Sequence, residues 1–102
     1  TDYAIKQFNN VIQLNPKALN AHYQLATIYL AQEQLDIAKH HYQAILAIHH
    51  EDANCLNNLG VIALKQNHSQ LAIDYFAKAL AVDNQHLDAR NNIAATFLQH
   101  DR

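Results

Sequence analysis

The sequence is poor in the residues that form turns, cross-links and phosphate loops. It has one glycine, one proline, one cysteine and no methionine or tryptophan among 102 residues. The single cysteine cannot form an internal disulfide, and the single glycine excludes a glycine-rich phosphate-binding loop. So little Gly and Pro also leaves few sites for β-turns. Because the chain is instead rich in Ala, Leu, Gln and Ile, it is predicted to be all-helical.

Charge of one sign and long apolar runs are missing as well. The formal net charge is −2, and acidic and basic residues are mixed along the chain, which argues against nucleic-acid binding. No apolar run approaches the roughly 20 residues of a membrane span, so no membrane insertion is expected, and a cytoplasmic location is favoured. No signal peptide is visible. Because the chain starts on Thr1 without an initiator methionine, a removed targeting segment or excision from a longer protein stays open.

The most informative feature is a repeat with a period of 34 residues. Shifting the sequence by this amount places like residues on like. The matching sets are Ala4, Ala38 and Ala72; Phe8, Tyr42 and Phe76; Leu25, Leu59 and Ile93; and Ala26, Gly60 and Ala94. A fixed period of this length is typical of an array in which no unit buries its apolar face alone. The function is therefore expected on a surface formed by stacking, and not in a catalytic cluster.

Apolar spacing predicts six helices, separated by short polar breaks. The predicted ranges are 2–14, 17–32, 35–48, 52–66, 69–82 and 86–100. Asn15 is expected to cap the second helix, with Pro16 in its first turn. Ser69 is expected to cap the fifth. Connections of two to four residues predict that neighbouring helices run antiparallel.

These residues resemble the tetratricopeptide repeat, whose pattern over about 34 residues is W-x2-L-G-x2-Y, then A-x3-F, then P. One full unit carries His22-x2-Leu25-Ala26-x2-Tyr29, then Ala38-x3-Tyr42 and His50. The next carries Leu56-x2-Leu59-Gly60-x2-Ala63, then Ala72-x3-Phe76 and Asn84. The opening stretch adds Ala4-x3-Phe8 and Pro16, and the closing stretch adds Ile93-Ala94-x2-Phe97. The chain departs from the family in lacking Trp, in losing Pro from two of three unit ends, and in having Glu33 where a turn Gly is usual.

The resemblance covers the whole chain and implies an all-α fold, a right-handed superhelical array of antiparallel helix pairs known as an α-solenoid. It divides residues 1–102 into a second helix of a preceding repeat (1–18), two full repeats (19–52 and 53–86) and a first helix of a following repeat (87–102). Small residues at Ala38, Ala72 and Gly60 let helix backbones approach closely, and Tyr42 and Phe76 fill the gaps between helices.

In this family the first helix of each unit lines a concave groove that faces the ligand. Carried over position by position, the peptide-binding groove consists of Asn20, Tyr23, Gln24, Thr27, Asn54, Asn57, Asn58, Val61, Lys65, Asp88, Asn91 and Asn92. Asn58 and Asn92, with Gln24 in line, resemble the asparagine ladder of the O-linked N-acetylglucosamine transferase repeats. A carboxamide has both a donor and an acceptor, so it can pair with a peptide backbone whatever the side chains are. The alternative is that these Asn residues are merely solvated.

Other kinds of site find less support. Family members that grip the C-termini of heat-shock chaperones need Lys and Arg in the groove, whereas here Lys65 stands alone with Asp88 opposing it. The eight His residues include no pair at i, i+4 spacing, so no metal site is predicted, and the histidines are interpreted as solvated surface residues. Cys55 is expected to pack as a small apolar residue. No cofactor and no catalytic residue is predicted.

The favoured function is a non-catalytic scaffold that binds a protein or peptide ligand in the groove. The alternative is a segment of a larger enzyme that recruits protein substrates to a transferase domain elsewhere in the chain. Head-to-tail self-association is a further prediction, because the first and last helices carry apolar residues patterned for cover on both sides. These residues are Ile5, Phe8, Ile12, Ile93, Phe97 and Leu98.

Overall fold

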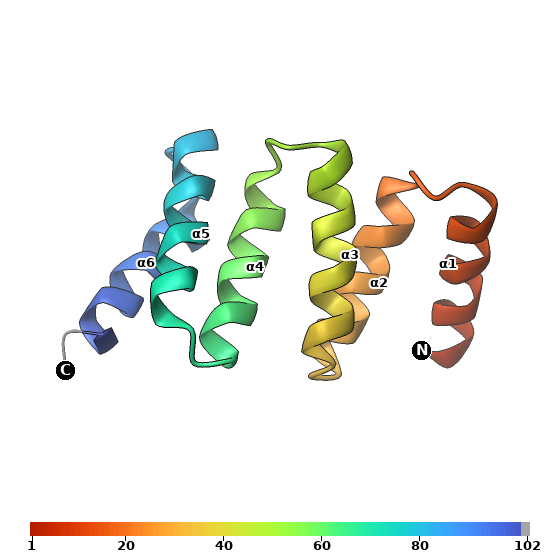
Figure 1. Ribbon diagram of the computed structural model, residues 1–102, viewed down its shortest axis with the longest axis horizontal. Helices are drawn as coiled ribbons and strands as arrows, with labels where there is room; N and C mark the ends of the chain where they lie inside the picture. The colour runs from red at the N-terminus through yellow and green to blue at the C-terminus, as the bar shows by residue number, and fades with distance from the viewer. Residues whose placement is uncertain (101–102) are drawn as a thin grey trace. The chain divides into compact units, whose positions relative to one another are not determined.

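The computed structural model describes residues 1–100 and places six α-helices in them (Figure 1). The helices are α1 (Asp2–Leu14), α2 (Leu19–Ala31), α3 (Leu35–Ile48), α4 (Ala53–Lys65), α5 (Ser69–Val82) and α6 (Leu87–His100). They form two compact units, residues 1–50 with α1 to α3 and residues 51–102 with α4 to α6. In each unit consecutive helices pack on one another, as short connections require.

The predicted helices agree with the structure to within two residues at each end. The ranges of α1, α3 and α5 are as predicted, and the other three helices are shorter than predicted by one or two residues at one or both ends. Two capping predictions were wrong. Asn15 ends α1 instead of capping α2, because its Oδ1 accepts the Lys17 N–H at 3.1 Å, and Ala18 takes the N-cap position. Ser69 is the first residue of α5, and His68 precedes it.

The tight turns after α2 and α4 are built alike. Glu33 and Asn67 both adopt positive φ, 59° and 63° respectively. The Gln34 N–H donates to the Tyr29 carbonyl at 2.9 Å, and the Glu33 N–H donates to the Leu30 carbonyl at 3.0 Å. This pair of bonds is a Schellman motif, and the turn after α4 repeats it. Glu33 in the first turn and Asn67 in the second therefore each adopt the left-handed backbone that Gly usually provides.

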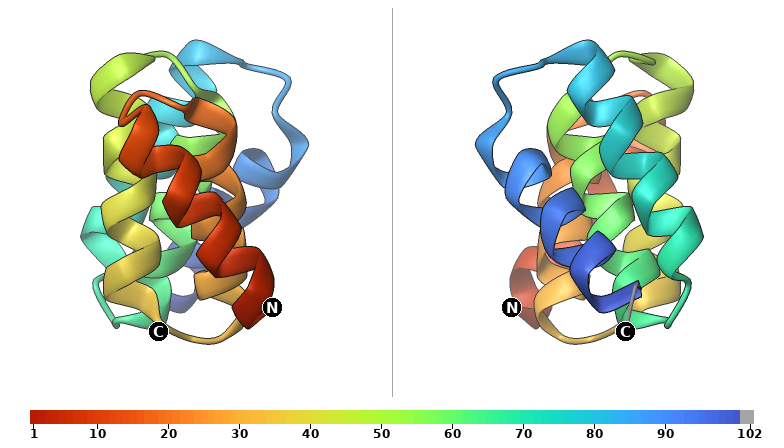
Figure 2. Two further views of the ribbon diagram at one scale, coloured as in Figure 1. Left: turned by 90° about the vertical axis from the view of Figure 1, so that its right-hand side faces the viewer. Right: turned by 90° about the vertical axis from the view of Figure 1, so that its left-hand side faces the viewer.

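The core of the first unit lies between α2 and α3. Its buried apolar side chains are Ala21, Leu25, Ala26, Ala38, Tyr42 and Ile45. α1 packs against α2 (Figure 2, left), and its Ala4, Ile5, Phe8 and Ile12 are half-buried. Ala4, Phe8, Leu25, Ala26, Ala38 and Tyr42 occupy positions that the 34-residue period marked as apolar or small.

The second unit is held together by close approach of α4 to α5. Gly60 on α4 lies under the ring of Phe76 on α5. An added Cβ at Gly60 would stand 2.5 Å from Phe76 Cε1. Phe76, Ala63 and Ala72 form a buried cluster that Val61, Leu64 and Ile93 cover. α6 packs mainly on α5 and also touches α4 (Figure 2, right). The close crossing explains why a residue without a side chain stands at this position.

Candidate peptide-binding surface

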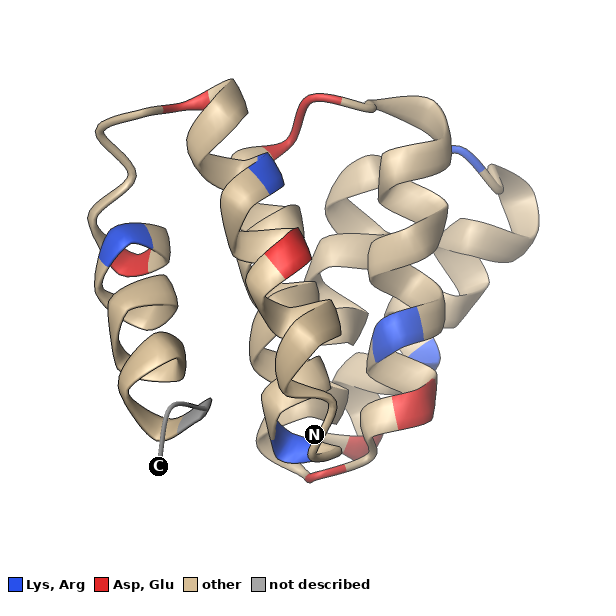
Figure 3. Cartoon of the chain, turned by 60° about the vertical axis from the view of Figure 1, so that its left-hand side comes forward, with Lys and Arg blue, Asp and Glu red and all other residues tan. Residues whose placement is uncertain are grey.

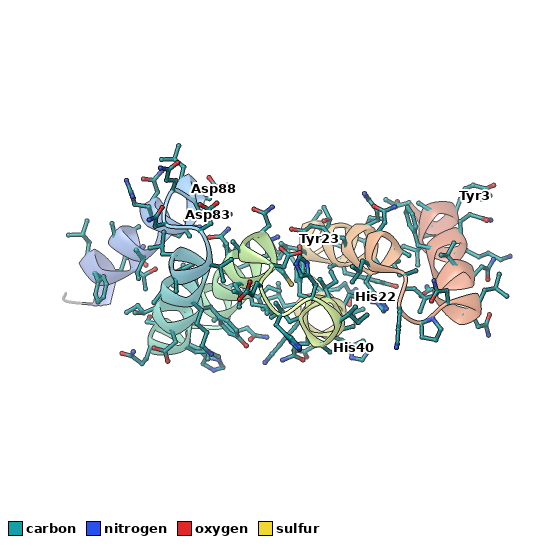
Figure 4. All side chains as sticks on the ribbon, turned by 90° about the horizontal axis from the view of Figure 1, so that it is seen from above. Tyr3, His22, Tyr23, His40, Asp83 and Asp88 are labelled. Atoms are coloured by element: carbon teal, nitrogen blue, oxygen red, sulfur yellow. The ribbon has the colours of Figure 1, made fainter. Side chains whose placement is uncertain are left out.

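The predicted groove residues of the first unit lie on α2. Asn20, Gln24 and Thr27 are exposed there, and Tyr23 is half-buried. Figure 4 labels Tyr23 on α2. Its ring meets that of Tyr42 edge to face, with 5.9 Å between centroids, so α3 fixes its position. The Thr27 hydroxyl donates to the Tyr23 carbonyl at 2.9 Å, which leaves its lone pairs as acceptors. α2 thus presents two carboxamides and a hydroxyl to solvent.

Two predicted residues of the second unit, Asn57 and Asn92, meet where α4 and α6 approach. Asn92 Nδ2 donates to Asn57 Oδ1 at 3.1 Å. Asn57 is only 6 % exposed, whereas Asn58 and Asn92 are half-buried. We define the carboxamide surface as Asn54, Asn57, Asn58, Asn91 and Asn92. Because Asn57 Oδ1 accepts a hydrogen bond from the Asn92 NH2 group, the orientation of the Asn92 carboxamide is fixed. The Oδ1 of Asn92 remains available as an acceptor.

The remaining predicted residues of this unit differ in their surroundings. Lys65, Asp88 and Asn91 are exposed. Val61 is half-buried and packs on the cluster of Ala63, Ala72 and Phe76, so it contributes to the core as well as to the surface. Lys, Arg, Asp and Glu are scattered over the helices and the turns between them (Figure 3). Of the predicted residues of this unit, five are Asn, and the two charged ones, Lys65 and Asp88, have opposite signs.

Sequence reasoning missed the role of His86 at the edge of this surface. The His86 Nδ1 accepts the Ala89 N–H at 3.1 Å, so His86 caps the start of α6. With Nδ1 accepting, the proton lies on Nε2, which donates to Asn54 Oδ1 at 2.6 Å. His86 therefore ties the carboxamide surface to the N-terminus of α6. The predicted helix began at His86 itself, and the available signal for a cap was a polar residue at that boundary, directly after the polar break at residues 83–85.

The interpretation of all histidines as solvated was wrong for two of them. His22 on α2 and His41 on α3 are 5 % and 8 % exposed, and their Nδ1 atoms lie 3.0 Å apart. The period contained the signal for His22, which occupies the position of Leu56 one unit later. Among the described side chains, which end at residue 99, no three His, Cys, Asp or Glu residues lie close enough together to hold a metal ion.

Cys55 packs as the small apolar residue that the sequence predicted. It is fully buried in α4, and its N–H donates to Asp52 Oδ1 at 3.0 Å, which caps the helix. Burial, and then the nearby Asp52 carboxylate, raise the pKa of the Cys55 thiol to about 12. The thiol therefore stays protonated at neutral pH and is a poor nucleophile.

The repeat pattern, the paired helices and the close crossing at Gly60 agree with a comparison against protein families. The family described as Tetratricopeptide repeat matches residues 17–85. The chain belongs to the tetratricopeptide repeat family. The predicted all-α solenoid class of antiparallel helix pairs is confirmed, as is the recognition of the repeat. Proteins of this family are typically non-catalytic scaffolds for protein–protein interaction. Comparison with curated proteins gives no match.

Solved tetratricopeptide repeat structures share this fold. A crystal structure of MamA has a TM-score of 0.87 at 18 % identity, over 95 % of this chain and 57 % of that one. MamA from Desulfovibrio magneticus RS-1 has a TM-score of 0.88 at 21 % identity, over 98 % and 56 %. The first repeat domain of Spaghetti (RPAP3), bound to the HSP90 peptide SRMEEVD, has a TM-score of 0.91 at 13 % identity, over 99 % and 80 %. The chain thus spans little more than half the length of the MamA structures. No helix in the described part of the chain is long and apolar enough to cross a membrane.

Proposed function

We propose that the chain is a non-catalytic scaffold that binds an extended segment of a partner protein through the first helices of its repeats. The observation that carries this proposal is the Asn57–Asn92 bond between α4 and α6. It holds a carboxamide in one orientation. A carboxamide held this way can donate to a peptide C=O and accept from a peptide N–H. As part of the proposal, residues 19–52 and 53–86 are the two full repeats. A cytoplasmic location is proposed as well.

The chemistry of this face favours a ligand bound by its backbone over one bound by its charge. The structurally similar first repeat domain of Spaghetti binds SRMEEVD, a peptide with two glutamates and an aspartate. Carboxylates need Lys or Arg partners. On the face predicted here, Lys65 is the one cation and Asp88 carries the opposite charge. We therefore expect uncharged extended peptides to bind better than SRMEEVD.

The proposal is tested with a phage-displayed library of random peptides, selected on the 102-residue chain. The best peptide is then titrated against Asn58→Ala/Asn92→Ala by calorimetry. Each lost hydrogen bond should cost about 0.5–1.5 kcal/mol, so the dissociation constant should rise roughly 5- to 150-fold. The matched control is Asn9→Ala/Asn10→Ala, which removes two exposed carboxamides from α1 and should leave affinity unchanged. Equal affinity of both double variants and wild type would reject the carboxamide surface. SRMEEVD binding more tightly than the selected peptide would instead favour a charge clamp.

We also propose that a second copy of the chain can stack on the exposed apolar face of α6. Leu87, Phe97 and Leu98 are 67 %, 48 % and 66 % exposed. On α1, Tyr3 and Leu14 are exposed as well, so an end-to-end contact would cover apolar surface on both copies. Sedimentation velocity over a concentration series should show association that Phe97→Glu suppresses and Val82→Glu, on the exposed side of α5, does not. A wild-type monomer at every concentration would rule the contact out.

A further inference from the structure

The buried contact between His22 and His41 joins three segments of the first unit. His22 lies on α2 and His40 on α3 (Figure 4), and His41 follows His40 on α3. The His22 Nε2 lies 2.8 Å from the carbonyl oxygen of Pro16, in the turn between α1 and α2. Because a carbonyl can only accept, His22 Nε2 carries its proton. The contact therefore ties α2 to the turn before it and, through His41, to α3.

The positions of the protons follow from these contacts. A neutral His22 that is protonated on Nε2 has an unprotonated Nδ1, which accepts a hydrogen bond. The atom 3.0 Å away is His41 Nδ1, so that atom must be the donor. One proton thus lies between the two rings. Adding a proton to His22 would place a second N–H at the same point, and the bond would be lost.

We propose that the His22–His41 pair makes the first unit acid-sensitive, because a proton added to His22 removes the hydrogen bond, and a proton added to His41 Nε2, although it keeps the bond, places a charge on a buried ring. Protonation on acidification leaves a positive charge in a buried position between α2 and α3. A buried charge without a partner is strongly unfavourable. The folded unit therefore resists protonation, and the unfolded chain takes up the proton more readily.

Two further ring side chains face the pair. His40 lies beside His41 with 5.6 Å between ring centroids, and Tyr29 stacks on His41 at 6.1 Å. Tyr42 on α3 is buried. The remaining titratable side chains of α1, α2, α3 and their turns are exposed or half-buried: Asp2, Tyr3, Lys6, Lys17, Tyr23, Glu33, Asp36, Lys39, His49 and His50. Burial, followed by His22 and His40, lowers the pKa of His41 to about 4. All three influences act in the same direction.

The direction of the effect on stability follows from linkage. In the unfolded chain a histidine has a pKa near 6.5, above that of folded His41. The pair's contribution to stability is therefore complete above about pH 6.5 and is lost as the pH falls towards 4. A single proton with these two pKa values raises the unfolding equilibrium constant about 30-fold between pH 7.5 and pH 5.

The test compares urea unfolding of wild type with His22→Phe/His41→Phe at pH 7.5, 6 and 5. Removing both partners together avoids leaving either ring without its hydrogen bond to the other. Between pH 7.5 and pH 5, the unfolding equilibrium constant of wild type should rise about 30-fold more than that of the double variant. His50→Gln, at an exposed position, serves as the matched control and should keep the wild-type dependence. An equal pH dependence in the double variant would overturn the proposal.

A second readout does not depend on the variant folding. Long-range ¹H–¹⁵N correlation spectra of wild type separate imidazole tautomers and follow their titration. His22 should appear as the Nε2–H tautomer and His41 as the Nδ1–H tautomer, with His41 still neutral at pH 5. A His41 resonance that titrates near pH 6.5 in the folded protein would contradict the proposal whatever the variant does.

Discussion

Replacing Gly60 by Ala tests the close helix crossing that defines the second unit. Two effects oppose each other at this position. Ala is favoured over Gly in a helix interior by about 1 kcal/mol. The new Cβ, however, would lie 2.5 Å, 2.7 Å and 2.9 Å from Cε1, Cδ1 and Cζ of Phe76. Normal carbon contacts are about 3.5–4.0 Å, so α4 and the Phe76 ring must separate by about 1 Å.

The Phe76 ring cannot move aside cheaply, because it is fully buried and packed against Ala63 and Ala72. Overpacking of a tight core costs about 1–3 kcal/mol, and contacts this short place Gly60→Ala near the upper end. After the gain in helix propensity, we expect a net loss of about 2 kcal/mol. For a chain of this size that lowers the melting temperature by about 8 °C or more.

The assay is urea unfolding of wild type, Gly60→Ala, Phe76→Leu and the double variant, followed by circular dichroism at 222 nm. Leu is smaller than Phe, so Gly60→Ala should cost less in the Phe76→Leu background, with a coupling energy of about 1 kcal/mol or more. Ala26→Gly is the control in the first unit, where the fully buried Ala26 already fits, and should destabilise by about 1 kcal/mol. Stabilisation by Gly60→Ala would refute the close crossing.

Three further predictions concern stability and reactivity. Ala72→Leu should destabilise by about 1–3 kcal/mol in urea unfolding, because Ala72 is fully buried beside Phe76; wild-type stability would show that this crossing has room. Glu33→Gly should stabilise by about 0.5–1 kcal/mol, since φ is 59° there and Gly adopts this backbone without strain, whereas Asn67→Gly should change less because Asn tolerates it. Cys55, with its pKa raised to about 12 by burial, should react with a thiol reagent at pH 8 only after urea unfolding; rapid reaction of the folded chain would contradict its burial.

Much of the fold was predictable because the same packing constraint acts at equivalent positions of successive repeats. A position such as Ala38 is constrained by a helix crossing, and Ala72 meets the same constraint 34 residues later. Helix caps depend instead on single side chains, and the capping predictions for Asn15 and Ser69 were wrong. Asn15 can cap a following helix or close an Asx turn, and the sequence does not separate the two. In the structure its Oδ1 accepts the Lys17 N–H.

The candidate surface was predictable in its residues but not in its contacts. Family positions identified Asn57 and Asn92, yet which Asn is buried depends on how α6 packs on α4. The bond joins Asn57 to Asn92, one residue off the 34-residue register that pairs Asn58 with Asn92. The buried histidines were missed because the residue type was given more weight than the position. His22 stands where the repeat places a core side chain, and a neutral imidazole can be buried once Pro16 and His41 satisfy its ring nitrogens.

The most direct test of the central proposal, that the first helices bind peptide through their carboxamides, is an NMR titration that observes Asn side-chain NH2 groups. ¹⁵N-labelled wild-type chain is titrated with the peptide selected from the phage library. The account predicts that the NH2 resonances of Asn58 and Asn92 shift with a common dissociation constant, while those of Asn9 and Asn10 on α1 stay in place. Shifts confined to α1, α3 or α5, with Asn58 and Asn92 unchanged at saturating peptide, would contradict it.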